Sequence, residues 1–256
     1  MRQTFLFIAL LACLTGAPAM AEPPSAALRL YAAGEYVAAA DLADGQPSAT
    51  SRALASRALL AACASANSSS EIDALLARAD ASARQALALD PGSVEALLQL
   101  ALVYGVEGRR ASLAHAFASG YAARGKRLID QALALDPDSA HAHALLGAWN
   151  LEVVRRGGVA GAMLYGARAS AGIAEFERAR ALAPDDILIV LHYAVALLAL
   201  DPVAHGPRAR ALIATVAVAH PGDALETLAQ QTAERLQAAL AQSPQDAQRV
   251  ARATLL

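Results

Sequence analysis

The sequence predicts an all-α protein built as a right-handed superhelical array of α-α repeats. One observation is the stretch 126–150, in which apolar residues at helical spacing stop at Asp136-Pro137 and then resume. Such a pattern on both sides of a proline turn is typical of a helix, a turn and a second helix. The other observation is that the same unit recurs at 81–104 and 175–198. Regular self-similarity indicates a repeat protein rather than a globule with a single core.

The N-terminus has the pattern of a secretory signal peptide, predicted to span residues 1–21. A positive charge and an apolar run precede Ala19-Met20-Ala21, a small-x-small cleavage site. We therefore expect the mature chain to begin at Glu22 and to be periplasmic. The alternative is a lipoprotein anchored at Cys13, because the residues that end at this cysteine resemble a lipobox.

The repeat domain is predicted to cover 22–222, and capping helices are predicted over 223–256. The helices expected before the first proline turn are a hairpin over 25–44 turned at Gly34, a helix over 51–66, and a helix that starts at Ser70 as N-cap and ends at Leu89. A single mature chain of this kind needs no second domain, since stacked repeats escape the usual size limit on one core.

The later turns are regular, with prolines at positions 91, 137, 184 and 221 that are 46, 47 and 37 residues apart. Proline cannot continue the preceding helix, and a Ser or Asp two residues later can cap the next one. The expected N-caps are Ser93, Ser139, Asp186 and Asp223. A long helix over 223–242 and a short one from Pro244 are expected to close the array.

The central units resemble the tetratricopeptide repeat family. The residues that fit its pattern are Leu100-Ala101 with Tyr104, Leu146-Gly147, and the set Gly172, Phe176, Ala179 and Pro184. The resemblance covers about 26–221. Because the family period is about 34 residues, the two central units carry inserts, at 105–125 and 151–171. Long central units of this kind also resemble the repeat domain of the regulator of microtubule dynamics family.

The resemblance implies a concave face lined by the first helix of each unit, with the inserts at its rim. The residues expected on this face are Leu98, Leu102, Ala144, Ala148, Leu151, Leu191, Val195 and Leu198, and those expected near it or on the rim are Tyr104, Arg109, Arg110, Trp149, Arg155, Arg156 and Tyr165. For Trp149 core packing is the expected role, and groove lining is the alternative. An apolar face of this length is normally covered or functional. Either Met163, Leu164 and Tyr165 fill it, or a partner helix or apolar ligand does.

No motif in the sequence indicates catalysis, a metal or a cofactor. Residues 120–126 nearly spell a phosphate-binding loop, but Arg127 stands where Ser or Thr would hold magnesium. His141 and His143 are two residues apart, which points their side chains to different sides of a helix. We expect them to be solvated at a helix end, and His192 to be a hydrogen-bonded core residue.

The net charge and the hydropathy pattern limit the classes of partner that we expect. The net charge is −2, with no basic run, which argues against nucleic acid. The longest uncharged mature run, 187–200, is too short to span a bilayer. We therefore expect a non-catalytic scaffold that binds another envelope protein. The alternative is a periplasmic carrier or chaperone for a small apolar ligand, as in the repeat-containing subunits of some transporters.

Overall fold

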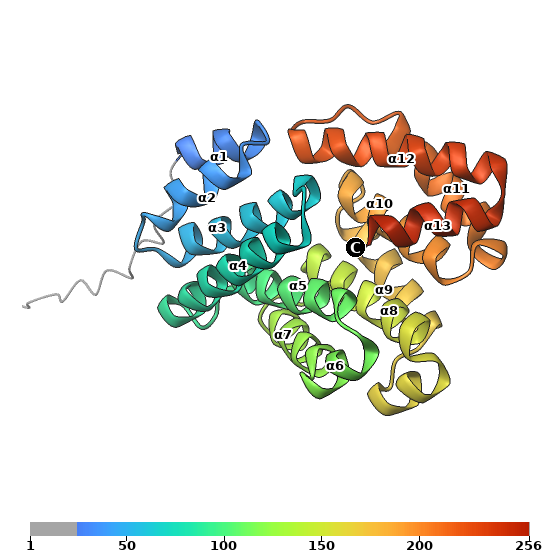
Figure 1. The fold of residues 1–256 in the computed structure, drawn as a ribbon, viewed down its shortest axis with the longest axis horizontal. Coiled ribbons are helices and arrows are strands. Elements are labelled where there is room, and N and C mark those ends of the chain that lie inside the picture. The colour runs from blue at the N-terminus through green and yellow to red at the C-terminus, as the bar shows by residue number, and fades with distance from the viewer. Residues whose placement is uncertain (1–24, 256) are drawn as a thin grey trace, which may run out of the picture.

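The computed structural model describes residues 25–255, and every regular element in that range is a helix (Figure 1). The predicted signal peptide and the lipobox cysteine Cys13 lie outside the described residues. The helices are α1 (Ser25–Ala32), α2 (Tyr36–Asp44), α3 (Ala49–Ala62), the short 3-10 turn η1 (Cys63–Ser65), α4 (Ser69–Leu89), α5 (Val94–Arg110), α6 (Leu113–Ala118), α7 (Tyr121–Leu135), α8 (Ala140–Tyr165), α9 (Ala169–Leu182), α10 (Ile187–Leu200), α11 (Pro202–Ala217), α12 (Ala224–Gln242) and α13 (Pro244–Thr254).

Consecutive helices pack as pairs, which confirms the predicted α-α solenoid. The main pairs are α3 with α4, α5 with α7, α8 with α9, and α10 with α11. The four predicted N-caps Ser93, Ser139, Asp186 and Asp223 each accept a hydrogen bond from a backbone N–H of the helix that follows. Each proline turn therefore ends one helix and starts the next.

Two predicted helix starts were wrong by two residues. Ser68, not Ser70, caps α4, and its hydroxyl accepts from the Glu71 backbone N–H at 3.2 Å. The Glu71 carboxylate accepts in return from the Asn67 backbone N–H at 2.7 Å, which completes the local capping of this helix. Ser48 caps α3, which begins at Ala49 rather than at Ser51. In both cases more than one serine lies near the start of the helix, and the sequence pattern does not choose among them.

The two inserts are mostly helical. The first provides the end of α5, the short helix α6 and the start of α7. The second lengthens α8 as far as Tyr165 and bends it at Gly158, whose φ of 57° and ψ of −151° only glycine adopts without strain. The bend lets the distal part of α8 project alongside α6.

The C-terminal helix α13 folds back onto α10, inside the curve of the array (Figure 1). Ala247 and Ala251 of α13 are fully buried, and the side chains of Gln248 and Arg252 both donate to the Ala199 carbonyl oxygen at 3.3 Å. Arg109 at the end of α5 donates from Nε to the Leu255 carbonyl oxygen at 2.7 Å. The chain thus covers much of its own concave side with α13.

The two ends of the array also meet. Leu225 of α12 packs against the N-terminal hydrophobic cluster, and α12 contacts α1. A Cβ atom added at Gly34 would lie 3.0 Å from the Ala224 Cβ atom, so the turn between α1 and α2 fits closely against the start of α12. Figure 1 shows these two ends side by side at the top of the molecule.

Candidate functional site

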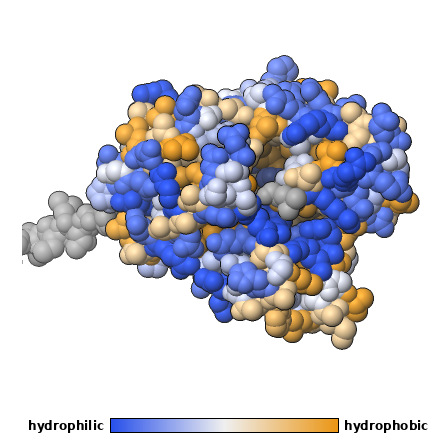
Figure 2. Space-filling model, in the orientation of Figure 1, coloured by the Kyte–Doolittle hydropathy of each residue, from blue (hydrophilic) through white to orange (hydrophobic). Residues whose placement is uncertain are grey.

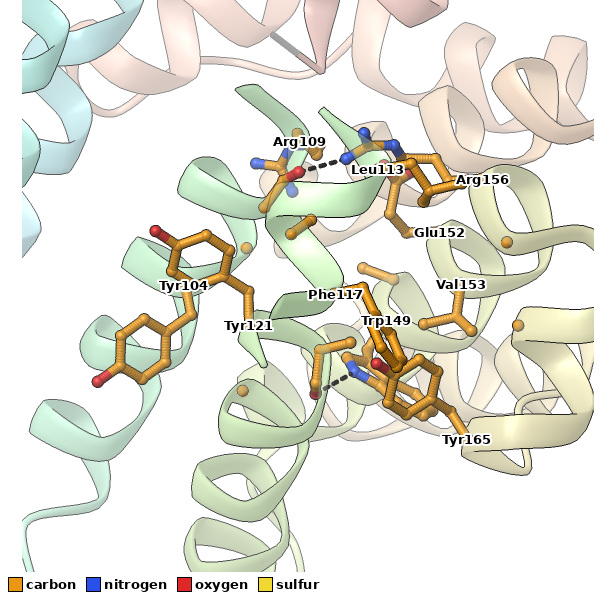
Figure 3. A pocket seen from close by; sticks show the side chains of 18 of the residues that line it. Tyr104, Arg109, Leu113, Phe117, Tyr121, Trp149, Glu152, Val153, Arg156 and Tyr165 are labelled. Carbon is orange, nitrogen blue, oxygen red and sulfur yellow. Dashed lines mark hydrogen bonds between the residues drawn. The ribbon is translucent and has the colours of Figure 1, made fainter. Parts of the chain in front are cut away.

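A cavity of about 710 Å³ lies between α5, α6, α7 and α8 (Figure 3). This volume lies within the range of small-molecule sites. Its walls consist mainly of aliphatic, aromatic and glycine residues. The lining includes Ala101, Leu102, Tyr104, Leu113, Phe117, Tyr121, Ala122, Ile129, Leu145, Ala148, Trp149, Val153, Ala160, Leu164 and Tyr165.

A capping serine and three glycine turns set the positions of the helices around the cavity. Ser112 caps the short helix α6 by accepting from the His115 backbone N–H. Gly120, with φ of 64°, then turns the chain sharply into α7. On the opposite wall Gly158 bends α8, and Gly166, with φ of 69°, ends it. The left-handed conformations at these turns cost glycine little, and they place α6 and the distal part of α8 on either side of the cavity.

Aromatic residues form one end of the cavity. Trp149 donates from Nε1 to the Ala122 carbonyl oxygen at 2.8 Å, which fixes its ring on α7. The ring of Tyr165 meets that of Trp149 edge to face, with centroids 6.4 Å apart. The amino group of Lys126 lies 5.7 Å from the centroid of the Trp149 ring. Figure 3 shows Phe117 pointing toward this pair from α6.

Charged residues gather at the other end, where α5 finishes. Arg156 donates to the Gly108 carbonyl oxygen and, at 3.0 Å, to that of Ala111, so it satisfies carbonyls at the end of the helix. Glu152 accepts both Nε and Nη2 of Arg155, at 2.8 and 2.7 Å. Desolvation lowers the pKa of Arg109, with Glu152 opposing this effect and Arg155 and Arg156 adding to it. Arg109 nevertheless stays protonated, so this end of the cavity is cationic.

The cavity mouth carries exposed apolar side chains. Leu113 and Phe117 of α6 are 56% and 62% exposed, and Leu164 of α8 is 61% exposed. Val159 and Met163 on the distal part of α8 are more exposed still. In Figure 2 apolar surface gathers at the lower right, where Figure 1 places α6 and the end of α8. We refer to these five residues as the apolar lips.

Comparisons with known proteins identify the family and the fold of this chain. The family described as regulator of microtubule dynamics protein 1-3 matches residues 38–226. The chain belongs to this family. Its fold is similar to that of a thermophilic TPR protein from Thermus thermophilus, with a TM-score of 0.57 and 20% sequence identity over 82% of this chain and 95% of that one. Among curated proteins no significant match is found.

The predicted tetratricopeptide-like family and fold are therefore confirmed, and the regulator of microtubule dynamics resemblance with them. Between residues 25 and 255, no helix combines the length and the apolar character needed to cross a membrane.

In this family member, seven of the predicted groove and rim residues line the cavity: Leu102, Tyr104, Arg109, Ala148, Trp149, Arg156 and Tyr165. Two predicted rim arginines are used elsewhere. Arg110 donates to the Asp73 carboxylate at 2.6 Å on the neighbouring helix α4, and Arg155 pairs with Glu152 on its own helix. Of the four arginines predicted at the rim, two therefore line the cavity and two form ion pairs elsewhere.

The other six predicted groove residues do not lie on an accessible surface. They are packed inside the helix layers, each with an exposed fraction of 8% or less: Leu98, Ala144, Leu151, Leu191, Val195 and Leu198. The accessible stripe of α10 is instead Leu188, His192 and Ala196. Because α10 is apolar on almost every side, its sequence does not define which stripe faces outward.

Of the two alternatives left open for the concave face, filling by the second insert is not observed. Met163 is 80% exposed, and Leu164 and Tyr165 line the cavity wall without filling it. The cavity residues that the sequence analysis missed include Leu113, Phe117 and Tyr121. Their spacing of four residues is a helical signal within the first insert.

Several polar residues for which no functional role was predicted contact carboxylates. His141 lies 3.2 Å from the Asp186 carboxylate, and His143 Nδ1 lies 2.6 Å from that of Glu175. His192 is exposed, so its assignment to the core was wrong. Residues 120–126, which resemble a phosphate-binding loop, form the start of α7, where Lys126 pairs with Asp130.

Proposed function

We propose that this protein is a non-catalytic binding protein that holds a ligand with a long apolar part in the α5–α8 cavity. The observation that carries the proposal is the cavity itself, about 710 Å³ with mainly apolar walls. Transfer of apolar groups from water into such walls is favourable by about 25 cal/mol per Å² of surface removed. A tetratricopeptide-like fold that binds rather than catalyses is consistent with the absence of a catalytic motif in the sequence.

The two ends of the cavity suggest how the ligand lies. The Trp149 and Tyr165 end is mainly aromatic, and its indole N–H is already bonded to Ala122. The opposite end offers Arg109 and Arg156, and its carboxylate, Glu152, is paired with Arg155. An apolar chain would therefore occupy the aromatic end, and any anionic group would lie toward the arginines.

A neutral apolar dye, N-phenyl-1-naphthylamine, tests the proposal by its fluorescence on binding. In Gly161→Leu a new side chain enters the cavity from α8, and an added Cβ atom there makes only ordinary contacts, the nearest 3.6 Å from the Val153 carbonyl oxygen. We expect dye affinity to fall at least tenfold, a loss of about 1.4 kcal/mol. The matched control Ala38→Leu adds an apolar residue on an exposed face of α2 and should leave affinity unchanged. Equal affinity in all three proteins would reject the cavity as the site.

A second candidate is a protein-binding scaffold, which the tetratricopeptide-like fold suggests. The apolar lips favour this candidate, because exposed apolar side chains beside a cavity are the usual anchors for an amphipathic helix of a partner. Replacing Met163, which is exposed and does not line the cavity, with Ser should then weaken capture of the partner while dye binding in the cavity persists. If Met163→Ser left capture of the partner unchanged, the apolar lips would have no role in binding it.

Export to the periplasm is part of the proposal and rests on the sequence of residues 1–21. Native mass spectrometry of the protein released gently from the envelope of its source tests the address and the ligand together. A chain that begins at Glu22 and carries a small adduct lost on denaturation is the expected result. A lipid-modified chain beginning at Cys13 would instead support membrane anchoring, and a protein-sized adduct would favour the scaffold.

A further inference from the structure

A second pocket, of about 310 Å³, lies between α4, α5 and α7. It is lined by Arg84, Leu100, Tyr104, Arg124, Arg127, Leu128 and Gln131. Tyr104 lines both this pocket and the apolar cavity, and Figure 3 shows its hydroxyl directed away from Trp149 and Tyr165. The aromatic ring thus contributes to the apolar cavity, and the hydroxyl belongs to a different, cationic environment.

Two guanidinium groups converge on the Tyr104 hydroxyl. Arg84 on α4 donates from Nη2 to this oxygen at 2.5 Å, and Arg124 on α7 donates to the same oxygen. The Arg124 guanidinium also lies over the Tyr104 ring, 4.0 Å from its centroid. Because the phenol oxygen has two lone pairs, it can accept both bonds. The tyrosine therefore holds two like charges together that would otherwise repel each other.

The charge of this pocket is only partly balanced. Asp80 accepts both Nε and Nη2 of Arg84, at 2.5 and 3.0 Å, and so offsets that arginine. Within residues 25–255, neither Arg124 nor Arg127 forms an ion pair with a carboxylate. The nearby Asp130 is engaged by Lys126 at 2.8 Å. The pocket therefore has an excess of about two positive charges in a protein whose net charge is −2.

We propose that Arg84, Arg124 and Arg127 form a binding site for the dianion of a phosphate monoester. Guanidinium groups match phosphate oxygens bidentately, and the three come from two helices, so they reach different oxygens of one tetrahedral group. A phosphate monoester carries a charge of about −1.5 to −2 at neutral pH, which balances Arg124 and Arg127. A diester carries only one negative charge and leaves one arginine unbalanced. Gln131 supplies a further neutral donor at the edge.

Calorimetric titration of the full chain with glycerol 3-phosphate, and with inorganic phosphate, tests the site. Ionic strength is held constant with chloride, and the diester dimethyl phosphate serves as the comparison ligand. We expect both phosphates to bind with a dissociation constant of about 1 mM or lower, and the diester at least fivefold more weakly. Arg127→Gln, which changes an exposed side chain that the fold does not depend on, should weaken binding at least fivefold.

Further variants separate the site from general charge effects. Arg124→Gln should weaken binding by a larger factor than Arg127→Gln, because its guanidinium stacks on Tyr104. Arg178 is an exposed arginine of α9 paired with Asp138 in the turn before α8, so Arg178→Gln should bind phosphate as the unchanged protein does. Gly161→Leu, which places a side chain in the apolar cavity, should also retain phosphate binding. This variant therefore distinguishes loss of binding in the apolar cavity from loss of binding at the phosphate site.

Vesicles distinguish the source of the phosphate. If glycerol 3-phosphate and vesicles with monoester headgroups both bind through Arg127, the site accepts the group from either source. If only the vesicles bind, and lose binding in Arg127→Gln, the group belongs to a membrane lipid. The proposal is overturned if neither binds above the chloride background, or if binding is the same in Arg124→Gln, Arg127→Gln and the unchanged protein.

Discussion

Two glycines bring the backbones of α8 and α9 into direct contact. A Cβ atom at Gly147 would lie 2.7 Å from Phe176 Cδ2 and 2.9 Å from the Gly172 carbonyl oxygen. Phe176 cannot easily move aside, because it is fully buried and stacks on Tyr193 with ring centroids 4.7 Å apart. The Leu-Gly element of the repeat pattern thus has a steric reason in this chain.

We therefore predict that Gly147→Ala lowers the free energy of unfolding by about 1–3 kcal/mol, the usual cost of overpacking. Urea denaturation followed by circular dichroism measures the change. Gly161→Ala on the same helix is the control, since its Cβ atom makes only ordinary contacts. A Gly147→Ala protein as stable as the Gly161→Ala protein would show that the two helices can separate freely.

His141 and Asp186 join the start of α8 to the start of α10. The hydrogen bond to Asp186 raises the pKa of His141 above 6.5, against the effect of burial. Burial favours a higher pKa for Asp186, but His141 and the backbone N–H groups of Ile189 and Leu188 outweigh it and lower the pKa below 3.8. The nearby charges Glu95 and Arg57 act on His141 with opposite signs.

The pH dependence follows from these two directions. The contribution of His141 to the free energy of unfolding is fully present below pH 6.5 and is lost as the pH rises through the folded-state pKa of His141. The Asp186 contribution is present above pH 3.8 and is lost as pH falls through its folded pKa. The pair therefore stabilises the fold most between about pH 4 and 6.5.

We predict that His141→Gln reduces stability at pH 5 and has progressively less effect as the pH is raised above 7. Thermal unfolding of both proteins across this range measures the difference. A stability difference for His141→Gln that does not change with pH would mean that the ion pair does not form in solution.

At the scale of helices, the sequence was most informative at the turns and least informative about faces. Proline stops and Ser or Asp caps depend on local chemistry, and so Ser93, Ser139, Asp186 and Asp223 could be assigned correctly. The outward face of α10 could not be assigned, because a helix that is apolar on most sides has no amphipathic stripe.

The candidate site could be predicted in part from residue type and position. Trp149, Tyr165, Arg109 and Arg156 were singled out by residue type and position, and they do line one cavity. The bend at Gly158 was not predicted, although it gives the distal part of α8 its direction. The cover that α13 provides is a contact between residues far apart in the sequence, and no local pattern indicates it.

The docking of α13 is predicted to depend on small residues at its buried face. Ala251 is fully buried against α10, whereas Ala253 on the same helix is exposed. Ala251→Arg should release α13 and make its arginines accessible to trypsin while the other helices remain folded. Ala253→Arg adds the same cleavage site on the outer face and should leave α13 protected. Equal cleavage of the two variants would mean that α13 is not held on α10.

At the scale of the molecule, contact between α1 and α12 changes how the array behaves. In an open solenoid each repeat touches only its neighbours, so the ends can fray independently. Here Leu225 packs into the N-terminal cluster that includes Ala27, Tyr36 and Leu59. Burial and the nearby Asp223 carboxylate, which lies at the start of α12, raise the pKa of Tyr31 to about 12, with Arg57 acting against them. The first helix and α12 therefore stabilise each other.

We predict that Leu225→Asp opens the array at this contact without unfolding its helices. A carboxylate placed against the N-terminal cluster would lose hydration without gaining a partner, which disfavours the closed arrangement. The radius of gyration from small-angle X-ray scattering should increase, while the helical circular dichroism signal stays the same. Leu89→Asp, at a leucine that is 55% exposed, is the matched control and should change neither quantity. If the radius of gyration of Leu225→Asp equals that of the control, the packing of the intermediate repeats, rather than contact between the ends, determines the curvature of the molecule.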